Sequence, residues 1–379
     1  MAEHVVIIGA GGSGRGFIAR LLQEENVKLC FVDQNVELVE ALNKRGQYGI
    51  RVGAKASKTV IRNYEAFVPD DEKAVTRAAQ ADWIFTAVGE EHLKELMPFL
   101  EKVTVKKGEP VRIVACENGI APKVVFRRAL EGSKAQDSMI TQGVIFCTSI
   151  PEKEGSLDII SEDYPELPYD IDEELFRLPF AHFPATPRLD RLLQRKIYTY
   201  NCLSACISYL GAYLKYDIYS DAANDGLIRQ YCTLLLTGLN RTLCRYMDVE
   251  PKEQTEFSKR ALKKFSNPNI SDTIQKNARS AVRKLAPTER IMGPMRLMEQ
   301  EGEDTFVLRL VAAAALLYLE RNEDLKYQNK EYPDAISLFR VLNPQTNERE
   351  IQCICGILEE LRKGKNLKEI SEESVCEVV

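Results

Sequence analysis

The first half of the chain alternates short apolar runs with stretches in which apolar residues recur at helical spacing. The apolar runs predict buried strands at 4–8, 28–32, 81–89, 111–116 and 143–147. The helical spacing predicts helices at 15–22, 35–44, 92–103 and 123–130. Strands that alternate with helices are typical of an α/β fold. We therefore expect a doubly wound, mainly parallel sheet of the Rossmann type.

The second half keeps helical periodicity and shows no strand alternation. An acidic, proline-rich stretch from 151 to 187 predicts irregular or β-extension structure leading out of the first domain. Beyond it, the pattern predicts amphipathic helices at 189–214, 226–247, 253–264, 270–285, 305–322, 334–342 and 348–363. We expect a ligand-binding α/β domain over 1–188 and an all-helical domain over 189–379 that closes over its crevice.

Composition narrows the class of protein. A chain of 379 residues with 45% hydrophobic residues is too long for one typical core. No apolar run approaches the roughly 20 residues that span a bilayer, and no signal-peptide pattern precedes the first apolar run. The net charge is −5, whereas proteins that bind nucleic acid usually carry an excess of basic residues. We expect a soluble cytoplasmic protein, a monomer or homodimer, with neither membrane nor nucleic-acid partners.

A glycine-rich loop follows the first predicted strand. Gly9, Gly11 and Gly14 form G-x-G-x-x-G, with Gly12 and Ser13 inside it, and the first predicted helix follows at once. Glycines in this motif let the backbone turn sharply and approach a pyrophosphate, while the amides of the helix N-terminus face the negative charge. The succession of strand, loop and helix predicts a dinucleotide-binding site.

An acidic residue after the second predicted strand indicates which dinucleotide binds. Asp33 lies 19 residues beyond Gly14, where a carboxylate accepts hydrogen bonds from the adenosine ribose. Asp33 would repel a 2′-phosphate, and the two residues after it are neutral, so the sequence favours NAD over NADP. The ends of the third and fourth predicted strands fall near the nicotinamide and supply Thr86, Val88, Gly89 and residues 117–119.

Histidine and cysteine usage argues against a metal site. The chain has three histidines, and none forms a ligand pair. Two cysteine pairs, Cys202 with Cys206 and Cys353 with Cys355, lack a second pair at zinc-site spacing. We expect no metal, and we expect the ten cysteines to be reduced, mostly buried thiols.

The segment that opens the helical half brings polar groups to one side of a helix. Lys196, Tyr200 and Ser204 are spaced by four residues, and Asn201 lies one step round. Metal-free oxidation of a secondary alcohol needs a base, and a lysine can serve when burial and a neighbouring cation such as Arg195 lower its pKa. Spacing alone, however, favours an ordinary lysine that reaches solvent at a helix start.

Several motifs, in order along the chain, resemble one enzyme family. They are GAGGSGRGFIARLL at 9–22, TAVG at 86–89, ACEN at 115–118, RKIYTYN at 195–201, YLG at 209–211, FSNP at 265–268 and RKL at 283–285. The chain resembles the zinc-independent long-chain polyol dehydrogenases, and among them the mannitol-1-phosphate 5-dehydrogenases. The resemblance implies hydride transfer between NAD(H) and a polyol or ketose, such as fructose 6-phosphate plus NADH giving mannitol 1-phosphate plus NAD.

The resemblance also implies catalytic roles. Lys196 matches the family's catalytic lysine, which would accept the hydroxyl proton during oxidation. Asn118 and Asn201 match two asparagines that would hold the reacting oxygen as charge develops, and Asn118 would also lie beside the cofactor. Ser204 stands where the family has a histidine and would supply a weaker hydrogen bond.

A basic segment late in the helical half resembles the part of the family that reaches the substrate. It implies substrate contacts from Arg279, Lys284 and Arg290. On one helix, Arg279 and Arg283 would share a face able to bind a phosphate monoester or hydroxyls. The same residues also fit a solvated helix face.

Two departures from the family pattern fall on the substrate side. Ser204 replaces the histidine, and Thr148-Ser149 stands where the family has Asp-Arg. One alternative is therefore an enzyme with a shifted substrate, such as another sugar, a sugar acid or an opine-like partner. The other alternative is a non-catalytic NAD(H)-binding regulator that keeps the fold. Retention of Lys196 and both asparagines favours an enzyme.

Overall fold

The structure, a computed structural model, forms two compact units, Met1–Leu193 and Gln194–Val379. It describes residues 3–25, 27–53, 58–117, 119, 121–268 and 272–370. Within those ranges, no helix has the length and apolar character needed to cross a membrane.

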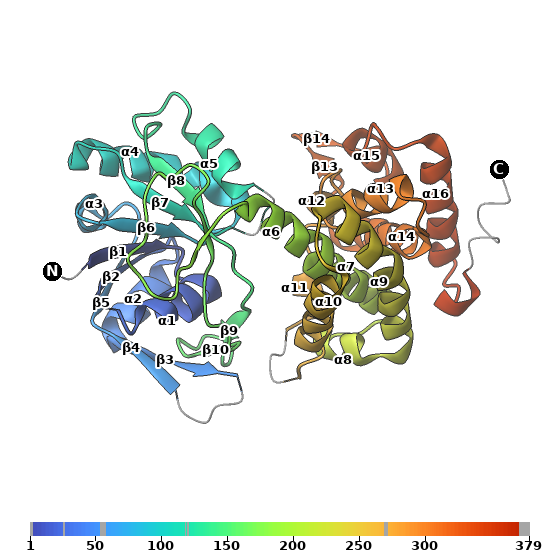
Figure 1. The fold of residues 1–379 in the computed structure, drawn as a ribbon, viewed down its shortest axis with the longest axis horizontal. Helices are drawn as coiled ribbons and strands as arrows, with labels where there is room; N and C mark the ends of the chain where they lie inside the picture. Colours follow the sequence, from blue (N-terminus) through green and yellow to red (C-terminus); the bar gives the residue numbers. More distant parts are fainter. Residues whose placement is uncertain are drawn as a thin grey trace. The chain divides into compact units, whose positions relative to one another are not determined.

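A six-stranded parallel sheet forms the centre of the first unit (Figure 1). Its strands lie in the order β5, β2, β1, β6, β7, β8, and every neighbouring pair is parallel. Their bounds are β1 Glu3–Ile8, β2 Val27–Val32, β5 Tyr64–Phe67, β6 Trp83–Thr86, β7 Arg112–Ala115 and β8 Met139–Gln142. The doubly wound parallel sheet is confirmed. Its strand order reverses between β1 and β6, and ligands bind at the carboxyl ends of strands at such a point.

Helices cover both faces of this sheet, because alternate residues of β1 enter two separate cores (Figure 1). Val5 and Ile7 lie in one buried cluster, while Val6 and Ile8 lie in the other. The first cluster is covered by η1 (Gly12–Ile18), α1 (Ala19–Leu22) and α2 (Val36–Arg45). The second is covered by α3 (Glu72–Ala79), η2 (Glu90–Leu96), α4 (Met97–Lys107) and α5 (Pro122–Leu130).

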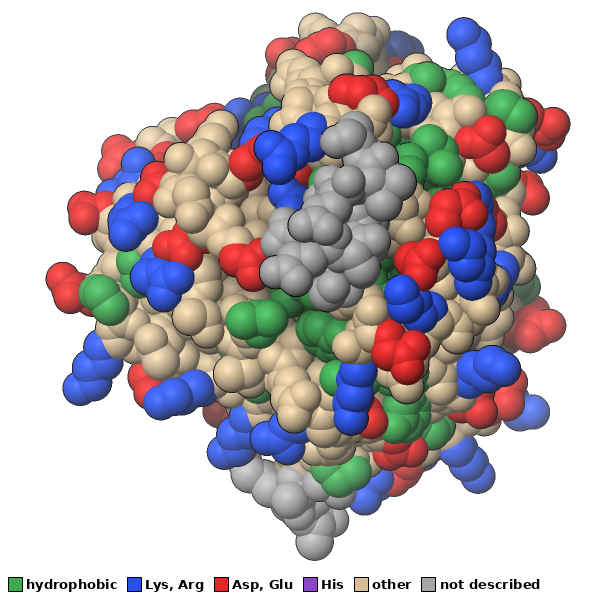
Figure 2. Space-filling model, turned by 90° about the vertical axis from the view of Figure 1, so that its right-hand side faces the viewer, with side chains coloured by type: hydrophobic (Ala, Val, Ile, Leu, Met, Phe, Trp, Pro, Cys, Tyr) green, Lys and Arg blue, Asp and Glu red, His purple; other side chains and the backbone are tan. Residues whose placement is uncertain are grey.

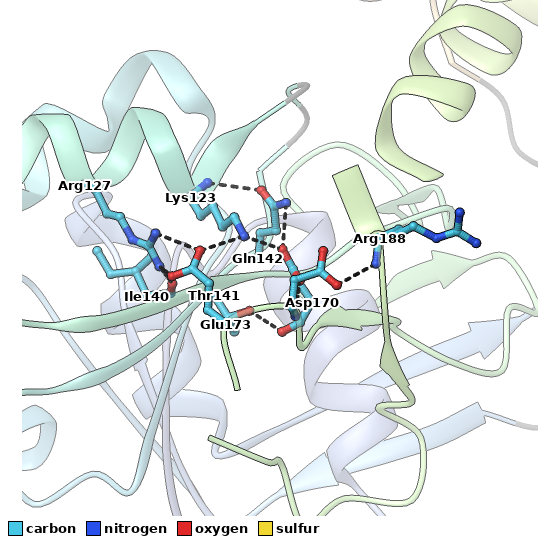
Figure 3. Close-up of polar contacts among 9 residues, drawn as sticks. Lys123, Arg127, Ile140, Thr141, Gln142, Asp170, Glu173 and Arg188 are labelled. Atoms are coloured by element: carbon cyan, nitrogen blue, oxygen red, sulfur yellow. Dashed lines mark hydrogen bonds and ion pairs between the residues drawn. The ribbon is translucent and has the colours of Figure 1, made fainter. Parts of the chain in front are cut away.

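The last strand of the sheet begins four residues before its predicted position. The apolar run 143–147 predicted a strand, but β8 is Met139–Gln142 and the run follows it. The prediction was wrong because the strand contains polar residues with a distant partner (Figure 3). Thr141 Oγ1 donates to the Asp170 backbone oxygen at 2.6 Å, and Gln142 Nε2 donates to Asp170 Oδ2 at 3.3 Å. Lys123 Nζ also pairs with that carboxylate, at 2.6 Å.

Smaller strands complete the first unit. Four of them form a second sheet in the order β4 (Lys58–Arg62), β3 (Gln47–Val52), β10 (Ile159–Ser161), β9 (Ser149–Pro151). The acidic, proline-rich stretch contains β10 and a parallel pair, β11 (Tyr169–Asp170) and β12 (Ala185–Thr186), with irregular segments between them.

Helices dominate the second unit. Helix α14 is buried on nearly all sides from Val307 to Leu319, as expected for an apolar helix inside a bundle. On the face drawn in Figure 2, basic and acidic side chains are interspersed. The helices are α6 (Leu189–Lys196, which enters from the first unit), η3 (Ile197–Asn201), α7 (Cys202–Tyr213), α8 (Tyr219–Asn224), α9 (Gly226–Met247), α10 (Pro251–Phe265), α11 (Ile274–Ala278), α12 (Ala281–Lys284), α13 (Met292–Gln300), α14 (Phe306–Asn322), α15 (Ala335–Leu342), α16 (Glu348–Arg362) and η4 (Leu367–Glu369).

Three predicted features of this unit differ in the structure. The predicted helix 189–214 contains a π-helical turn, η3, between α6 and α7. The predicted helix 270–285 is divided into α11 and α12, because Ser280 is left-handed with φ +61° and the Ala281 amide donates to Glu323 at 2.9 Å. A hairpin of β13 (Lys326–Tyr327) and β14 (Lys330–Glu331) makes the unit mostly, rather than wholly, helical.

Candidate active site

The loop after β1 follows a path that requires glycine. Gly9 has φ +97°, which residues with a side chain rarely adopt. A Cβ on Gly14 would lie 1.9 Å from the Gly9 carbonyl oxygen. Nothing lies within 4 Å of the position that a Cβ on Gly11 would take. The loop therefore leaves open space beside Gly11, where a pyrophosphate can approach the amides of Gly12 and Ser13.

A cavity of about 250 Å³ lies beside this loop within the first unit. Asp33 lines it and is held in place, since Oδ2 accepts from the Ala10 amide at 2.7 Å and Oδ1 accepts from the Asn35 amide at 2.9 Å. Each oxygen keeps a lone pair for a ribose hydroxyl. One wall of the cavity is apolar and suits an adenine ring; it consists of Val32, Pro69, Leu96 and Phe99. The sequence did not predict this wall, because no local motif marks it.

The buried carboxylate of Glu117 supports the loop after β6, a role that its sequence motif did not reveal. Its Oε2 accepts from the Gly89 amide at 2.6 Å, and its Oε1 accepts from the Val88 amide at 3.3 Å. Burial raises the pKa of Glu117, although the two amides favour its charged form. These contacts fix the loop that begins at the buried Thr86. Asn118 lies outside the described residues.

Ser149, one of the departures from the family pattern, packs behind the glycine loop. A Cβ on Gly12 would lie 2.1 Å from the Ser149 carbonyl oxygen, and a Cβ on Gly16 would lie 2.6 Å from the Ser149 Cβ. The preceding residue, Thr148, is held through its amide, which donates to Glu162 Oε2 at 2.6 Å. Ser149 therefore has a packing role within the first unit.

In the second unit, Lys196 ends α6 and is buried, with 8% of its surface exposed. Burial, with a smaller contribution from the charges of Lys264 and Arg290, lowers its pKa from 10.5 to about 7. A lysine of this pKa is present in both protonation states at neutral pH, so it can accept and return a proton. The alternative of a lysine that reaches solvent does not match this burial.

Arg195 is not the cation that lowers the Lys196 pKa, contrary to the sequence-based expectation. Its Nη1 pairs with Glu253 at 2.6 Å, and its Nε donates to Gln254 Oε1 at 2.8 Å. Its guanidinium also lies over the Phe257 ring, 4.3 Å from the centroid. These contacts compensate its charge, and cations from more distant segments act on Lys196 instead.

The π-helical turn η3 follows Lys196 directly and ends at Asn201. In an α-helix, residues five positions apart point to different sides, whereas the wider π turn joins such residues and brings them toward one side. The turn therefore places a buried amide, Asn201, on the side that carries Lys196. Ser204 accepts a hydrogen bond from the Tyr219 hydroxyl at 3.0 Å, so its own proton stays available.

Arg290 is buried and only partly satisfied. Its Nε donates to Glu289 Oε2 at 2.9 Å. Its Nη2 is buried and has no hydrogen-bond partner in the part of the chain that the structure describes. A buried guanidinium nitrogen without a partner is unfavourable, and an anionic or hydroxyl-bearing ligand can satisfy it.

Lys284 is a second buried lysine. Its Nζ donates to the Asn277 backbone oxygen and lies 5.8 Å from the centroid of the Tyr209 ring. Burial, followed by the charges of Arg290 and Arg283, lowers its pKa to about 7. Arg290 thus acts on both lysines. We call Lys196, Lys264, Lys284 and Arg290 the basic cluster.

Arg279 has a different setting from the one predicted. The break at Ser280 leaves Arg279 beyond the end of α11 and Arg283 within α12, so the prediction that they share a helix face was wrong. Arg279 is exposed, but its charge also lowers the pKa of Lys284. It therefore lies close to the basic cluster without being buried in it.

In the described ranges, most cysteines are free thiols. No group of three or more His, Cys, Asp or Glu side chains there could hold a metal ion. Cys202 and Cys206 are among eight free cysteines. Cys353 is disulfide-bonded, which corrects the expectation that every cysteine is reduced.

Comparison with known proteins relates both halves of the chain to one family. Residues 3–153 match the mannitol dehydrogenase Rossmann domain, and residues 188–367 match the mannitol dehydrogenase C-terminal domain. The mannitol-1-phosphate 5-dehydrogenase of Anoxybacillus flavithermus is 30% identical over 336 residues, 83% of this chain and 87% of that protein. The enzyme of the same name from Lacticaseibacillus casei is 28% identical over 341 residues, 84% of this chain and 88% of that protein.

Two solved structures share the fold at lower identity. Pseudomonas fluorescens mannitol 2-dehydrogenase, in a ternary complex with NAD and D-mannitol, has a TM-score of 0.71 and 15% identity, covering 100% of this chain and 94% of its own. A D-sorbitol dehydrogenase in substrate-free form has a TM-score of 0.64 and 13% identity, covering 100% of this chain and 91% of its own. At these identities the likeness concerns the fold.

Proposed function

The chain belongs to the mannitol dehydrogenase family, and from that premise we propose that it transfers a hydride between NAD(H) and a polyol or ketose. The proposed pair is mannitol 1-phosphate and fructose 6-phosphate, in keeping with the names of its relatives. The observation that carries the proposal is Lys196, a buried amine with a pKa of about 7.

The first unit has the features that a dinucleotide needs. NAD, when bound, supplies the carbon that accepts or donates the hydride. Open space beside Gly11 fits the pyrophosphate, and the cavity beside Asp33 fits the adenosine. The Asp33 carboxylate disfavours a 2′-phosphate, which supports NAD over NADP. The residues proposed to hold the cofactor are Gly9, Gly11, Gly12, Ser13, Gly14, Asp33, Thr86, Val88, Gly89 and Asn118.

Lys196 is the proposed base. As the polyol is oxidised, its neutral amine would accept the hydroxyl proton, and in the reverse direction the ammonium would return it. Asn201, brought to the same side by the π turn, would donate to the substrate oxygen as negative charge develops on it. Ser204 would give a further hydrogen bond. Asn118 keeps the role that the family resemblance implies.

Basic side chains support a phosphorylated substrate. The buried Nη2 of Arg290 would bond to a phosphate oxygen, and a charge-assisted bond of this kind is about twice as strong as a neutral one. Arg279 and Arg290 both lower the pKa of Lys284 through their charges, so the three side chains lie close enough to interact. Lys284 and Arg279 would therefore add to the attraction for the phosphate.

An NADH fluorescence assay tests the function. With purified protein, fructose 6-phosphate should consume NADH and yield mannitol 1-phosphate, while free fructose should react more slowly because it lacks the phosphate. If NADH binds but no ketose, sugar acid or amine acceptor is reduced, the chain is a regulator rather than an enzyme.

A second candidate is an enzyme of the same type with a shifted substrate. Ser204 favours it, because a hydroxyl engaged with Tyr219 stands where the family has an imidazole. Extending the panel to sugar acids and to amine acceptors separates the two. Turnover with one of these and none with fructose 6-phosphate would support the shifted substrate.

A further inference from the structure

The helical unit contains a cavity of about 400 Å³ that none of the proposed active-site residues lines. Its walls come from the turn after α7, the start of α11 and the last turns of α14. This volume falls within the range of small-molecule sites, which is roughly 300–1,000 Å³. The cavity is therefore large enough for a metabolite of monosaccharide size.

Polar groups without partners line this cavity. The side chains of Lys215, Arg321, Gln275 and Asp217 make no hydrogen bond or ion pair with any described residue, and neither does the Tyr318 hydroxyl. Lys215 and Arg321 are positively charged donors, Asp217 is an acceptor, and Gln275 and the Tyr318 hydroxyl can donate or accept. An anion bearing hydroxyl groups would satisfy both kinds of group.

Neighbouring basic residues are compensated, which sets Lys215 and Arg321 apart. Lys365, near the Tyr213 hydroxyl that donates to its backbone, pairs with Glu360 at 2.7 Å. Arg362 pairs with Glu320. Lys215 also has φ +63°, in the left-handed region where a helix usually ends with glycine. Lys215 and Arg321 are thus exposed cations that line the cavity without an ion pair to any described residue.

We infer that this cavity binds a small phosphorylated sugar or polyol as an effector. The phosphate would lie between Lys215 and Arg321, whose N–H groups would donate charge-assisted hydrogen bonds to its oxygens. Hydroxyl groups would donate to Asp217 and accept from Gln275. The carbon face would pack on the Tyr318 ring. Binding at this cavity does not depend on the proposed function, whereas its regulatory effect does.

Helix α11 connects the cavity to the basic cluster. Thr273, Ile274 and Gln275, at its start, line the cavity. At its other end, the Asn277 backbone oxygen accepts from Lys284 Nζ. A ligand that shifts α11 would therefore move the carbonyl group that positions Lys284.

The end of α14 provides a second connection. The Tyr318 ring, in the cavity wall, packs edge-on against Tyr209 with centroids 5.8 Å apart. Tyr209 in turn lies under Lys284 Nζ. Glu323, which follows the cavity residues of α14, accepts from the Ala281 amide at the start of α12. Both connections end at Lys284, so the effector would alter the part of the unit proposed to bind the substrate phosphate.

Calorimetry and hydrogen exchange test this inference without using turnover. The probes are glucose 6-phosphate, free glucose and inorganic phosphate. The test variant is Lys215→Gln/Arg321→Gln, and the charge-matched control is Lys330→Gln/Arg349→Gln, which changes two exposed cations of the same unit outside the cavity. Melting temperatures confirm that both variants fold, and the two single variants serve if the double variant does not.

The expected result is that glucose 6-phosphate binds the wild type and the control, and binds the test variant at least tenfold more weakly. Exchange should slow at 212–217 and 318–322 and also at 277–284. Unchanged affinity in the test variant, no binding to the wild type, or equal affinity for inorganic phosphate alone would overturn the sugar-phosphate site. Slowing confined to the cavity residues would overturn the link to Lys284. An inactive enzyme would change none of these readouts.

Discussion

The glycine loop of the first unit and the basic cluster of the second both suit negative charge, but by different physical means. The loop offers neutral backbone amides and the space that Gly9 and Gly14 leave. The basic cluster uses ionisable side chains, and burial lowers the pKa of Lys196 and Lys284 to about 7. Backbone amides do not titrate near neutrality, whereas these lysines do. In the proposed function, sensitivity to pH therefore belongs to the helical unit and cofactor recognition to the α/β unit.

The largest effect is expected from Lys196→Met, which removes the amine of the basic cluster and keeps an unbranched side chain of similar length. We expect kcat to fall by roughly 10²- to 10⁴-fold, the usual contribution of a general base. The NADH dissociation constant should stay within about twofold, because the loop is unchanged. Lys263→Met, an exposed lysine on α10, is the control and should keep wild-type kinetics. Wild-type turnover in Lys196→Met would remove this residue from the mechanism.

Gly14→Ala tests the other region, the glycine loop of the first unit. The added Cβ would lie 1.9 Å from the Gly9 oxygen, so the backbone must shift. Strain of about 1–3 kcal/mol corresponds to a roughly 5- to 150-fold loss of NADH affinity, measured by fluorescence titration. Gly226→Ala is the control, because nothing lies within 4 Å of its Cβ, its φ is not positive, and it lies in the second unit. NADH affinity that is unchanged in Gly14→Ala would show that the loop does not bind the cofactor.

Arg290→Gln tests whether the basic cluster binds the phosphate group of the substrate. Loss of a charge-assisted hydrogen bond, worth about 1.5–3 kcal/mol, should raise KM for fructose 6-phosphate by roughly 10- to 100-fold. The KM for free fructose should change little, so the preference for the phosphorylated ketose should shrink. Arg349→Gln, which changes an exposed arginine, is the control. An equal rise of KM for both ketoses would mean that Arg290 does not contact the phosphate.

The pH profile gives the smallest effect and separates the two lysines. The neutral amine is the reactive form in oxidation, so kcat/KM should rise about tenfold per pH unit up to about pH 7 and then level off. Reduction needs the ammonium and should fall above that pH. Lys284→Met should leave the inflection in place. If the inflection disappears in Lys284→Met, the proton is handled by Lys284 rather than Lys196.

Local patterns predicted those parts of the molecule that depend on neighbouring residues in the chain. The glycine loop and Asp33 could be read directly, because a strand, a turn and a helix follow one another there. The position of β8 could not be predicted, because its polar side chains hydrogen-bond to Asp170, which is distant in the sequence. The helix break at Ser280 could not be predicted either, because the next amide, of Ala281, donates to the distant Glu323. The motif around Lys196 identified the lysine but not the cations that lower its pKa. Lys264 and Arg290 are distant in the sequence and come near Lys196 only when the chain folds.

The most direct test of the account is the titration of Lys196 itself. In protein with isotope-labelled lysine side chains, NMR signals of Lys196 can be assigned by their loss in Lys196→Met. We expect a midpoint near pH 7, displaced upward in Arg290→Gln because a neighbouring positive charge is removed. A midpoint near 10.5, the ordinary value for lysine, would contradict it.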